Sequence, residues 1–473
     1  QSNISRSAWT TLVILSCLGL ITMYGETMVL PAIPDFIRDF NISYNTSSWI
    51  LSSYLIAGAV MTPIAGRLSD IYGKKKILLI VMAVYSTGIL AGGFANSIEF
   101  MLAARAAQGV GMSMFPIAFG IIREILPEKK LAIGQTIFSS TFSGGAVVGL
   151  IVGATIIQNF GWQATFFSIF PIAVILGLVI RKLIYVRNLA TSEVKVEGEG
   201  RNDNENSSVK KQTIDLKGTV ALAVTIISFL AGISFLENNS TDTGFQVAGL
   251  FSVAAVSLAV FIVIEKKVSS PLLDLKLMTH RMILPATIIL MMVFLCMFMV
   301  YQTIPILVRS PQPLGFGGDS VDAANVQLPF MIMFLVFASI TPFIINRIGS
   351  IKPTIIGGII SLIGALGLLT FHSTEFAISA NLAIIASGLS LTMTATWNMV
   401  VSSSPKEFTG ISVGVGALLL FIGMAIGPAL AGVYMENHET VEGIGGSYPS
   451  HGSYNLVFLT AILLSAVSLG FAL

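Results

Sequence analysis

Two charged residues, Glu26 and Arg105, stand inside long apolar segments. A carboxyl group removed from water loses solvation of its charged form, so it can bind and release a proton near neutral pH. An arginine in an apolar segment costs on the order of several kcal/mol unless it is paired, so it marks a functional position by default. We therefore expect proton chemistry at these two residues. The alternatives are a solvated Glu26 near the end of its segment and an Arg105 that backbone carbonyls and Gln108 satisfy for packing alone.

The composition places these two residues in a membrane protein. Of the 473 residues, 54% are apolar and 11% charged, whereas soluble domains carry about 25% charged residues. This excludes a soluble enzyme with one membrane anchor, and the net charge of +2 supplies no basic face for nucleic acid. Both cysteines, Cys17 and Cys296, lie in apolar segments, which argues against a disulfide framework.

The apolar residues form runs long enough to cross about 30 Å of hydrocarbon as helices. They predict an all-α polytopic membrane protein with 14 transmembrane helices. The first run lacks a small-residue cleavage pattern, so we interpret it as a span rather than a secretion signal, and the start at Gln1 indicates a trimmed chain. The predicted spans are 9–31, 48–66, 76–95, 100–123, 133–158, 163–184, 214–236, 245–265, 282–307, 326–346, 352–371, 376–400, 408–434 and 455–473.

The basic residues predict the orientation, because Lys and Arg gather on the cytoplasmic side of membrane proteins. With the N-terminus inside, 23 of the 26 basic residues fall on the cytoplasmic side. Only Arg38 and Arg309 fall on the other side, and Arg105 lies inside a span. We expect a multi-pass protein of the cell membrane with a cytoplasmic N-terminus.

A polar stretch and a repeat divide the chain. Residues 188–213 are charged and rich in Gly, Asn and Ser, which predicts a flexible cytoplasmic linker. Gly149 and Gly427 occupy similar places 278 residues apart, as an internal repeat of six spans would place them, although 44 glycines also produce matches by chance. The predicted parts are an N-terminal six-helix bundle, the linker, a two-helix insert and a C-terminal six-helix bundle, over 1–187, 188–213, 214–267 and 268–473.

The connection after the second span carries the string G-x-L-x-D-x-x-G-K-K-K over 66–76. Gly66 and Gly73 allow a tight turn between helices, and Asp70 can pair with a base and face a helix N-terminus. The string resembles the loop 2–3 signature of the major facilitator superfamily. Residues 105–111, R-x-x-Q-G-x-G, are similar to the pattern of that superfamily's fourth helix.

Other segments resemble the fourteen-helix drug:proton antiporter branch of that superfamily. These are Ala32-Ile33-Pro34, Ser48-Trp49 and the segment 271–275. The resemblance implies two six-helix bundles plus a two-helix insert, a role in proton movement for Arg105, and a monomeric exporter of amphipathic or cationic drug-like compounds. It implies no cofactor, with a proton gradient as the energy source. The residues of the implied gating motif are Gly66, Arg67, Asp70, Gly73, Lys74 and Lys75.

Two departures from the branch's pattern keep other transport modes open. Aligning Ala32-Ile33-Pro34 puts Gly25 at the branch's usual acidic position, and a shift of one residue rotates a helical side chain by about 100°. Leu150 replaces the Pro of the antiporter motif, which weakens antiport relative to symport or facilitated movement. The glycines and proline of this helix-packing motif are Gly145, Gly149, Gly153, Gly427 and Pro428.

Candidates for a substrate cavity are polar, aromatic and Met side chains inside spans, which suit amphipathic molecules. A proton-coupled symporter or metabolite exporter of the same fold is the nearest alternative. A membrane sensor or intramembrane enzyme is the alternative from another class, but it would need His, Cys or clustered acids within spans, and no metal-ligand spacing is present. The cavity candidates are Tyr24, Gln108, Met112, Phe115, Tyr301, Gln302, Trp397 and Asn398.

Overall fold

The computed structural model confirms an almost entirely helical membrane protein. It describes residues 5–184, 216–235, 241–268, 281–403, 409–437, 441–443 and 446–472. The predicted linker 188–213 and the segment 271–275 lie outside these residues, as do the side chains of Arg67 and Asp70.

Thirteen of the predicted spans correspond to one helix each in the described part of the chain, and the fourteenth corresponds to two. Twelve helices are long and apolar enough to cross a membrane, and a thirteenth, α9, is a shorter apolar helix. The remaining span is α5 and α6, which the 3-10 turn η2 joins. The first bundle consists of α1 (Arg6–Thr27), η1 (Leu30–Ala32), α2 (Ile33–Phe40), α3 (Tyr44–Tyr72), α4 (Lys74–Gly93), α5 (Ile98–Gly109), η2 (Val110–Ser113), α6 (Met114–Ile125), α7 (Glu128–Phe160) and α8 (Trp162–Leu183).

The second half follows the two helices of the insert. Its α16 and α17 are joined through two three-residue antiparallel strands, which the hydropathy pattern does not predict. The elements are α9 (Leu216–Ser234), α10 (Thr241–Lys267), α12 (Ile283–Arg309), α13 (Ser320–Ile348), α14 (Ile351–Thr370), α15 (Glu375–Ser403), α16 (Thr409–Asn437), β1 (Val441–Gly443), β2 (Gly446–Tyr448) and α17 (His451–Ala472).

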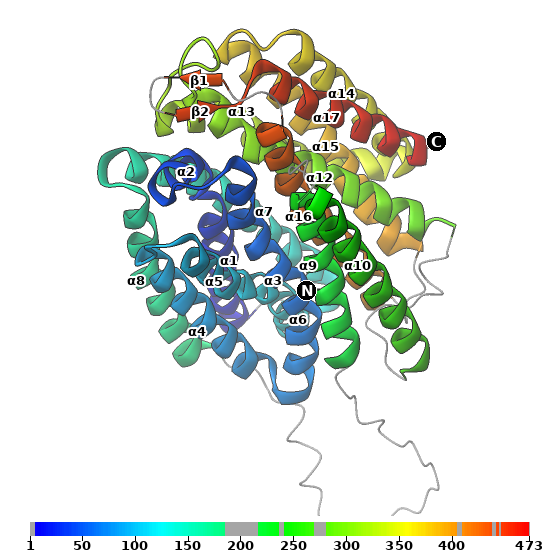
Figure 1. The fold of residues 1–473 in the computed structure, drawn as a ribbon. Coiled ribbons are helices and arrows are strands. Elements are labelled where there is room, and N and C mark those ends of the chain that lie inside the picture. Colours follow the sequence, from blue (N-terminus) through cyan, green and yellow to red (C-terminus); the bar gives the residue numbers. More distant parts are fainter. Residues whose placement is uncertain are drawn as a thin grey trace, which may run out of the picture.

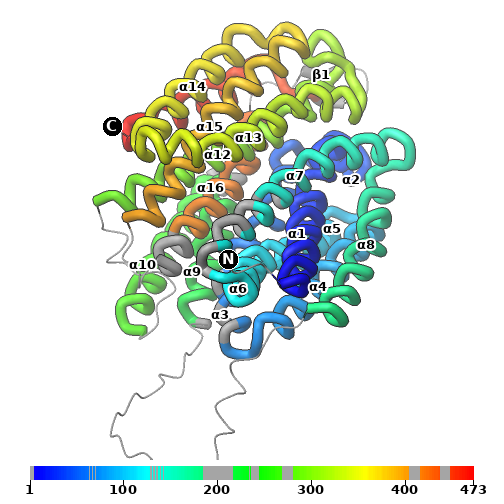
Figure 2. The backbone as a smooth tube through the Cα atoms, turned by 180° about the vertical axis from the view of Figure 1, so that it is seen from behind, coloured from blue at the N-terminus to red at the C-terminus, as the bar shows by residue number. Residues whose placement is uncertain are grey.

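The helices form two bundles with a helical pair at one flank (Figure 1). The view from behind separates the blue-to-teal helices α1 to α8 from the yellow-green-to-red helices α12 to α17 (Figure 2). The bundles meet where α3 packs on α16 and α7 on α13, while α9 and α10 pack on each other and α9 also contacts α3 and α16. We call the end of the spans that carries α2 and the α12–α13 connection the Asp35 end, and the opposite one the Lys74 end.

Glycines let helices of each bundle pack closely. A Cβ at Gly145 or Gly149 would collide with the α1 backbone at Leu20 or Tyr24. In the second bundle a Cβ at Gly423 or Gly427 would collide with the backbone of α12. Small residues bring helix backbones together in this way in membranes, so α7 sits on α1 as α16 sits on α12. This matches the predicted internal repeat.

The string at 66–76 folds differently from the predicted loop. Helix α3 continues to Tyr72, so Gly66 is helical, and the turn rests on Gly73 alone with φ 96°. Only glycine adopts such a φ without strain. The hydropathy pattern ends the span at residue 66 because the helix continues beyond the apolar run as a polar extension.

Candidate functional site

Arg105 on α5 is fully buried and joins three helices. Its Nε donates to the Ile50 carbonyl of α3 at 3.1 Å, and its Nη1 donates to the Gly25 carbonyl of α1 at 3.2 Å. The guanidinium also lies 4.5 Å from the ring centroid of Tyr54, where the π face attracts a cation. These bonds satisfy part of the guanidinium, but Nη2 has no hydrogen-bond partner among the described residues.

Local spacing on α5 builds this arrangement. Gln108 lies three residues after Arg105, on the same helix face, and its Oε1 accepts from Arg105 Nη1 at 2.7 Å. Its Nε2 donates to the Gly25 carbonyl at 3.2 Å. Gly109 follows, and a Cβ there would collide with the Tyr54 carbonyl of α3. The R-x-x-Q-G part of the string therefore positions a cation, its amide partner and a close helix contact.

Glu26 lies one residue before the end of α1 and is only 2% exposed. Both carboxyl oxygens lack a hydrogen-bond partner in the described part of the chain. Arg105 acts on the carboxyl through space, but no ion pair within 4.0 Å joins the two side chains among the described contacts. The buried position rules out a solvated Glu26. A buried carboxylate without partners is costly, and binding a proton removes the part of that cost that comes from the charge.

The second bundle contributes polar and aromatic groups beside this pair. Tyr301 of α12 lies within electrostatic range of Glu26, and its ring packs edge-on against Phe330 at 5.4 Å between centroids. The neighbouring Gln302 donates from Nε2 to Ser47 Oγ of α3 at 3.0 Å, one turn before Ile50. The site therefore includes both halves of the molecule.

Other predicted cavity residues lie apart from this group. Tyr24 interacts with Ser168 of α8 inside the first bundle. Phe115 packs at a tilt against Phe119 and Phe138, with centroid separations of 4.7 Å and 5.3 Å, and Met112 packs against Gly58. Trp397 lies beside Gly416, and the exposed Asn398 donates to Ser350 Oγ at 2.7 Å. Of the predicted candidates, Gln108 bonds to Arg105 and Tyr301 interacts with Glu26, while Gln302 follows Tyr301 on α12.

The predicted gating motif contributes an ion pair at the Lys74 end. Lys74 Nζ pairs with Glu124 Oε1, which ties the start of α4 to the end of α6. The same lysine lies against Gly120, where a Cβ would press on its side chain. Lys76 lies 5.9 Å from the ring centroid of Tyr72 across the Gly73 turn. These contacts hold helices of the first bundle to one another.

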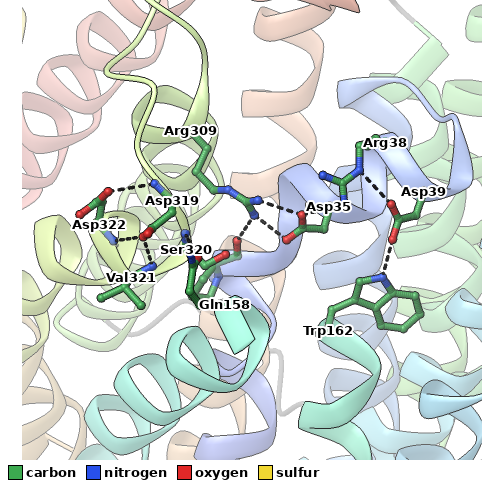
Figure 3. A network of polar contacts seen from close by, with 11 residues as sticks. Asp35, Arg38, Asp39, Gln158, Trp162, Arg309, Asp319, Ser320, Val321 and Asp322 are labelled. Carbon is green, nitrogen blue, oxygen red and sulfur yellow. Dashed lines mark hydrogen bonds and ion pairs between the residues drawn. The ribbon is translucent and has the colours of Figure 1, made fainter. Parts of the chain in front are cut away.

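The sequence does not predict a polar network at the Asp35 end, where the two halves meet (Figure 3). Arg309 of α12 binds Asp35 of α2 with both nitrogens, at 2.5 Å and 2.8 Å, and donates to the Pro31 carbonyl at 2.9 Å. Gln158 of α7 accepts from the Ser320 backbone N–H of α13 at 3.3 Å. The available signal was the isolation of Arg309, one of two basic residues assigned to that side.

This network extends within the first bundle. Arg38 donates to Asp35 at 3.2 Å and to Asp39 at 3.0 Å, and the Trp162 indole N–H donates to Asp39 at 2.9 Å. A cavity of about 230 Å³ lies among these side chains. We call the bidentate Asp35–Arg309 ion pair the latch, because it is the ion pair that joins the two halves among the described residues.

The comparison with known proteins matches a family model, described as the Major Facilitator Superfamily, to residues 15–428. The chain belongs to the major facilitator superfamily. Relatives include the multidrug resistance protein Stp of Mycobacterium tuberculosis, 26% identical over 88% of this chain and 74% of the relative. The tetracenomycin C resistance and export protein of Streptomyces glaucescens is 24% identical over 92% and 77%.

Solved structures share the superfamily's fold at low identity. The xylose transporter XylE from E. coli, in a partially occluded inward-open conformation, has a TM-score of 0.63 at 11% identity and covers 97% of this chain and 98% of its own. An auto-inhibited peptide transporter of the POT family has a TM-score of 0.64 at 13% identity, with 99% and 96% covered. As a member of this superfamily the protein is a multi-pass membrane transporter and not an enzyme.

Proposed function

We propose that this protein exports amphipathic or cationic drug-like compounds in exchange for protons by alternating access. The buried, unpartnered Glu26 beside Arg105 carries the proposal. One proton, or one positive charge on a substrate, can compensate the carboxylate, and a site that accepts either in turn couples their movements. The relatives described as multidrug and tetracenomycin C exporters support the substrate class.

The arrangement of the halves supports a conformational assignment. Alternating access rocks one six-helix bundle against the other around a site near the membrane centre. The latch and the neighbouring polar contacts hold the bundles together at the Asp35 end. The excess of basic residues near the opposite end favours the cytoplasm for the Lys74 end. We assign the structure to a state closed toward the outside, with one chain as the working unit and the proton gradient as the sole energy source.

Symport is the second candidate, and one observation favours it. Helix α7 carries the buried Leu150 where the antiporter motif has Pro, whereas α16 contains Pro428. A helix without an internal proline keeps its hydrogen-bond ladder and bends less. If the bend is required for exchange, the protein would move its substrate in the same direction as the proton.

Transport in everted membrane vesicles tests the proposal. A proton gradient is imposed with the interior acidic, and uptake of a fluorescent cation and of tetracycline is followed in the parent, Glu26→Gln and Glu99→Gln. We expect proton-driven uptake by the parent and by the control Glu99→Gln, since Glu99 is exposed at the start of α5. Glu26→Gln keeps the side-chain size but cannot titrate, so its uptake should fall to background.

Three results would contradict parts of this proposal. Equal uptake by Glu26→Gln and the parent would show that Glu26 is not needed for proton coupling. Uptake that persists without a proton gradient would show that the protein moves its substrate by facilitated movement and not by exchange. Substrate release driven by the same gradient, in place of uptake, establishes symport.

A further inference from the structure

A groove of about 360 Å³ runs between α3 and α4 of the first bundle, away from Glu26 and the latch. Buried side chains, among them Ala65 and Val81, form its floor. Its rim includes Tyr72, Ile80 and Val84, which are 58%, 50% and 37% exposed. Exposed apolar side chains on the outside of a membrane bundle face hydrocarbon, so the groove opens toward lipid.

The groove has one polar end. Lys76 and Tyr72 lie at the Gly73 turn, and the other lining side chains are apolar. Lys76, Ile80 and Val84 follow one face of α4 at intervals of one turn, so the groove extends about 12 Å from the lysine toward the membrane centre. Lysine at a helix end keeps its ammonium group in the interface and lays its stem along apolar surface. The groove therefore begins at a positive group in the membrane interface and continues as an apolar channel toward the membrane centre.

The positive charge of Lys76 at the polar end of the groove favours lipids with an anionic headgroup. Lys74, two residues earlier, is paired with Glu124, whereas Lys76 lies over the face of Tyr72 at the mouth of the groove. A basic residue at a membrane surface attracts an anionic headgroup by about 1 kcal/mol. Hydrocarbon in the groove and a phosphate at Lys76 would satisfy both parts of the surface at once.

We propose that the α3–α4 groove binds one acyl chain of an anionic phospholipid whose phosphate contacts Lys76. A bound lipid would connect the last turn of α3 to the first turn of α4, on either side of the Gly73 turn. This inference rests on the groove and its charge, and it holds whichever direction or ion the transport uses.

Lipid retention by the purified full-length protein tests the site. Protein in detergent receives an equimolar mixture of phosphatidylglycerol and phosphatidylcholine with matched chains, and native mass spectrometry counts each bound lipid. We expect the parent to retain phosphatidylglycerol in preference, and Lys76→Gln to lower this preference about fivefold, as the loss of one interfacial charge predicts. Lys352→Gln is the matched control, because Lys352 stands near the start of α14 and does not line the groove.

A second variant tests the apolar part. Val84→Trp fills the inner end of the groove from an exposed position and leaves Lys76 in place, so it should reduce retention of both lipids. Soluble glycerol phosphate should not compete, because it has no chain. The proposal is overturned if Lys76→Gln and Lys352→Gln lower the preference for phosphatidylglycerol equally. It is also overturned if Val84→Trp retains both lipids as the parent does. Displacement of the bound lipid by tetracycline or ethidium, one molecule for one, would show that the groove binds the transported compounds in place of a lipid.

Discussion

The two ends of the spans are held by different kinds of contact. At the Asp35 end, charged and polar side chains join one bundle to the other, through Asp35 and Arg309 and through Gln158 and Ser320. At the Lys74 end, the described ion pair of Lys74 with Glu124 joins two helices of the same bundle. The contacts between bundles at the Asp35 end must break if the bundles rock apart there. The Lys74–Glu124 pair within one bundle can persist throughout. If the bundles rock as proposed, we expect the contacts at the Asp35 end to change between the two states and the Lys74–Glu124 pair to remain.

The backbone also connects the latch to Glu26, where we propose that a proton binds. Glu26 lies on α1, and Asp35 lies nine residues later on α2, beyond the short turn η1. On the partner side, Tyr301 and Arg309 lie eight residues apart on one helix, α12. A displacement of α1 against α12 near Glu26 would therefore reach the latch through two continuous segments. A change of charge at Glu26 therefore has a short path to the latch, which the proposed exchange of a proton for substrate would use.

Breaking the latch should have the largest conformational effect. Arg309→Ala leaves the buried Asp35 without its partner across the halves, and removing one member of such a pair costs about 2–5 kcal/mol. Because that cost applies only to the closed state, the population should shift toward opening at the Asp35 end. Spin labels at Gln163 and Thr374, one exposed position in each bundle at this end, would report a longer distance in a background without Cys17 and Cys296.

Arg38→Ala is the matched control for that experiment. Arg38 also pairs with Asp35, but from the same helix, and its side chain is 70% exposed. Its removal should leave the label distance unchanged. The reversed pair Asp35→Arg with Arg309→Asp should restore the short distance in part. If the label distance lengthens equally in Arg38→Ala and Arg309→Ala, the loss of a positive charge near Asp35 causes the opening, and the contact between the halves does not.

A smaller shift is expected at a second contact between the bundles. The Tyr44 backbone N–H donates to Glu436 Oε2 at 2.9 Å, which joins the start of α3 to the end of α16. Glu436→Gln keeps an acceptor oxygen but removes its charge, and charged acceptors exceed neutral ones by about 1 kcal/mol. The same labels should report a partial opening, less than that of Arg309→Ala, with Glu99→Gln as the control. An unchanged label distance in Glu436→Gln would show that the latch, and not the Tyr44–Glu436 contact, holds the bundles together at this end.

The sequence predicts what depends on local composition and misses what depends on docking. The spans were predictable because a segment in hydrocarbon must satisfy its own backbone, and only long apolar helices do so here. Glu26 and Arg105 were predictable because a charge inside an apolar run stands out, and Gln108 because its spacing places it on the same helix face. The Asp35–Arg309 pair joins residues 274 positions apart. Its geometry follows from how two finished bundles meet, which no local pattern records.

The weakest effect should come from the Lys74 end, and its smallness is informative. Lys74 and Glu124 have side chains that are 18% and 29% exposed, and such a pair near the surface contributes about 0–1 kcal/mol. Lys74→Gln should therefore lower the thermal unfolding temperature slightly and leave the Gln163–Thr374 distance unchanged, because the pair joins helices of one bundle. Thermal unfolding in detergent and the label distance measure the two quantities separately. A lengthened distance in Lys74→Gln would mean that this ion pair changes between states, and the distinction between the two ends would fail.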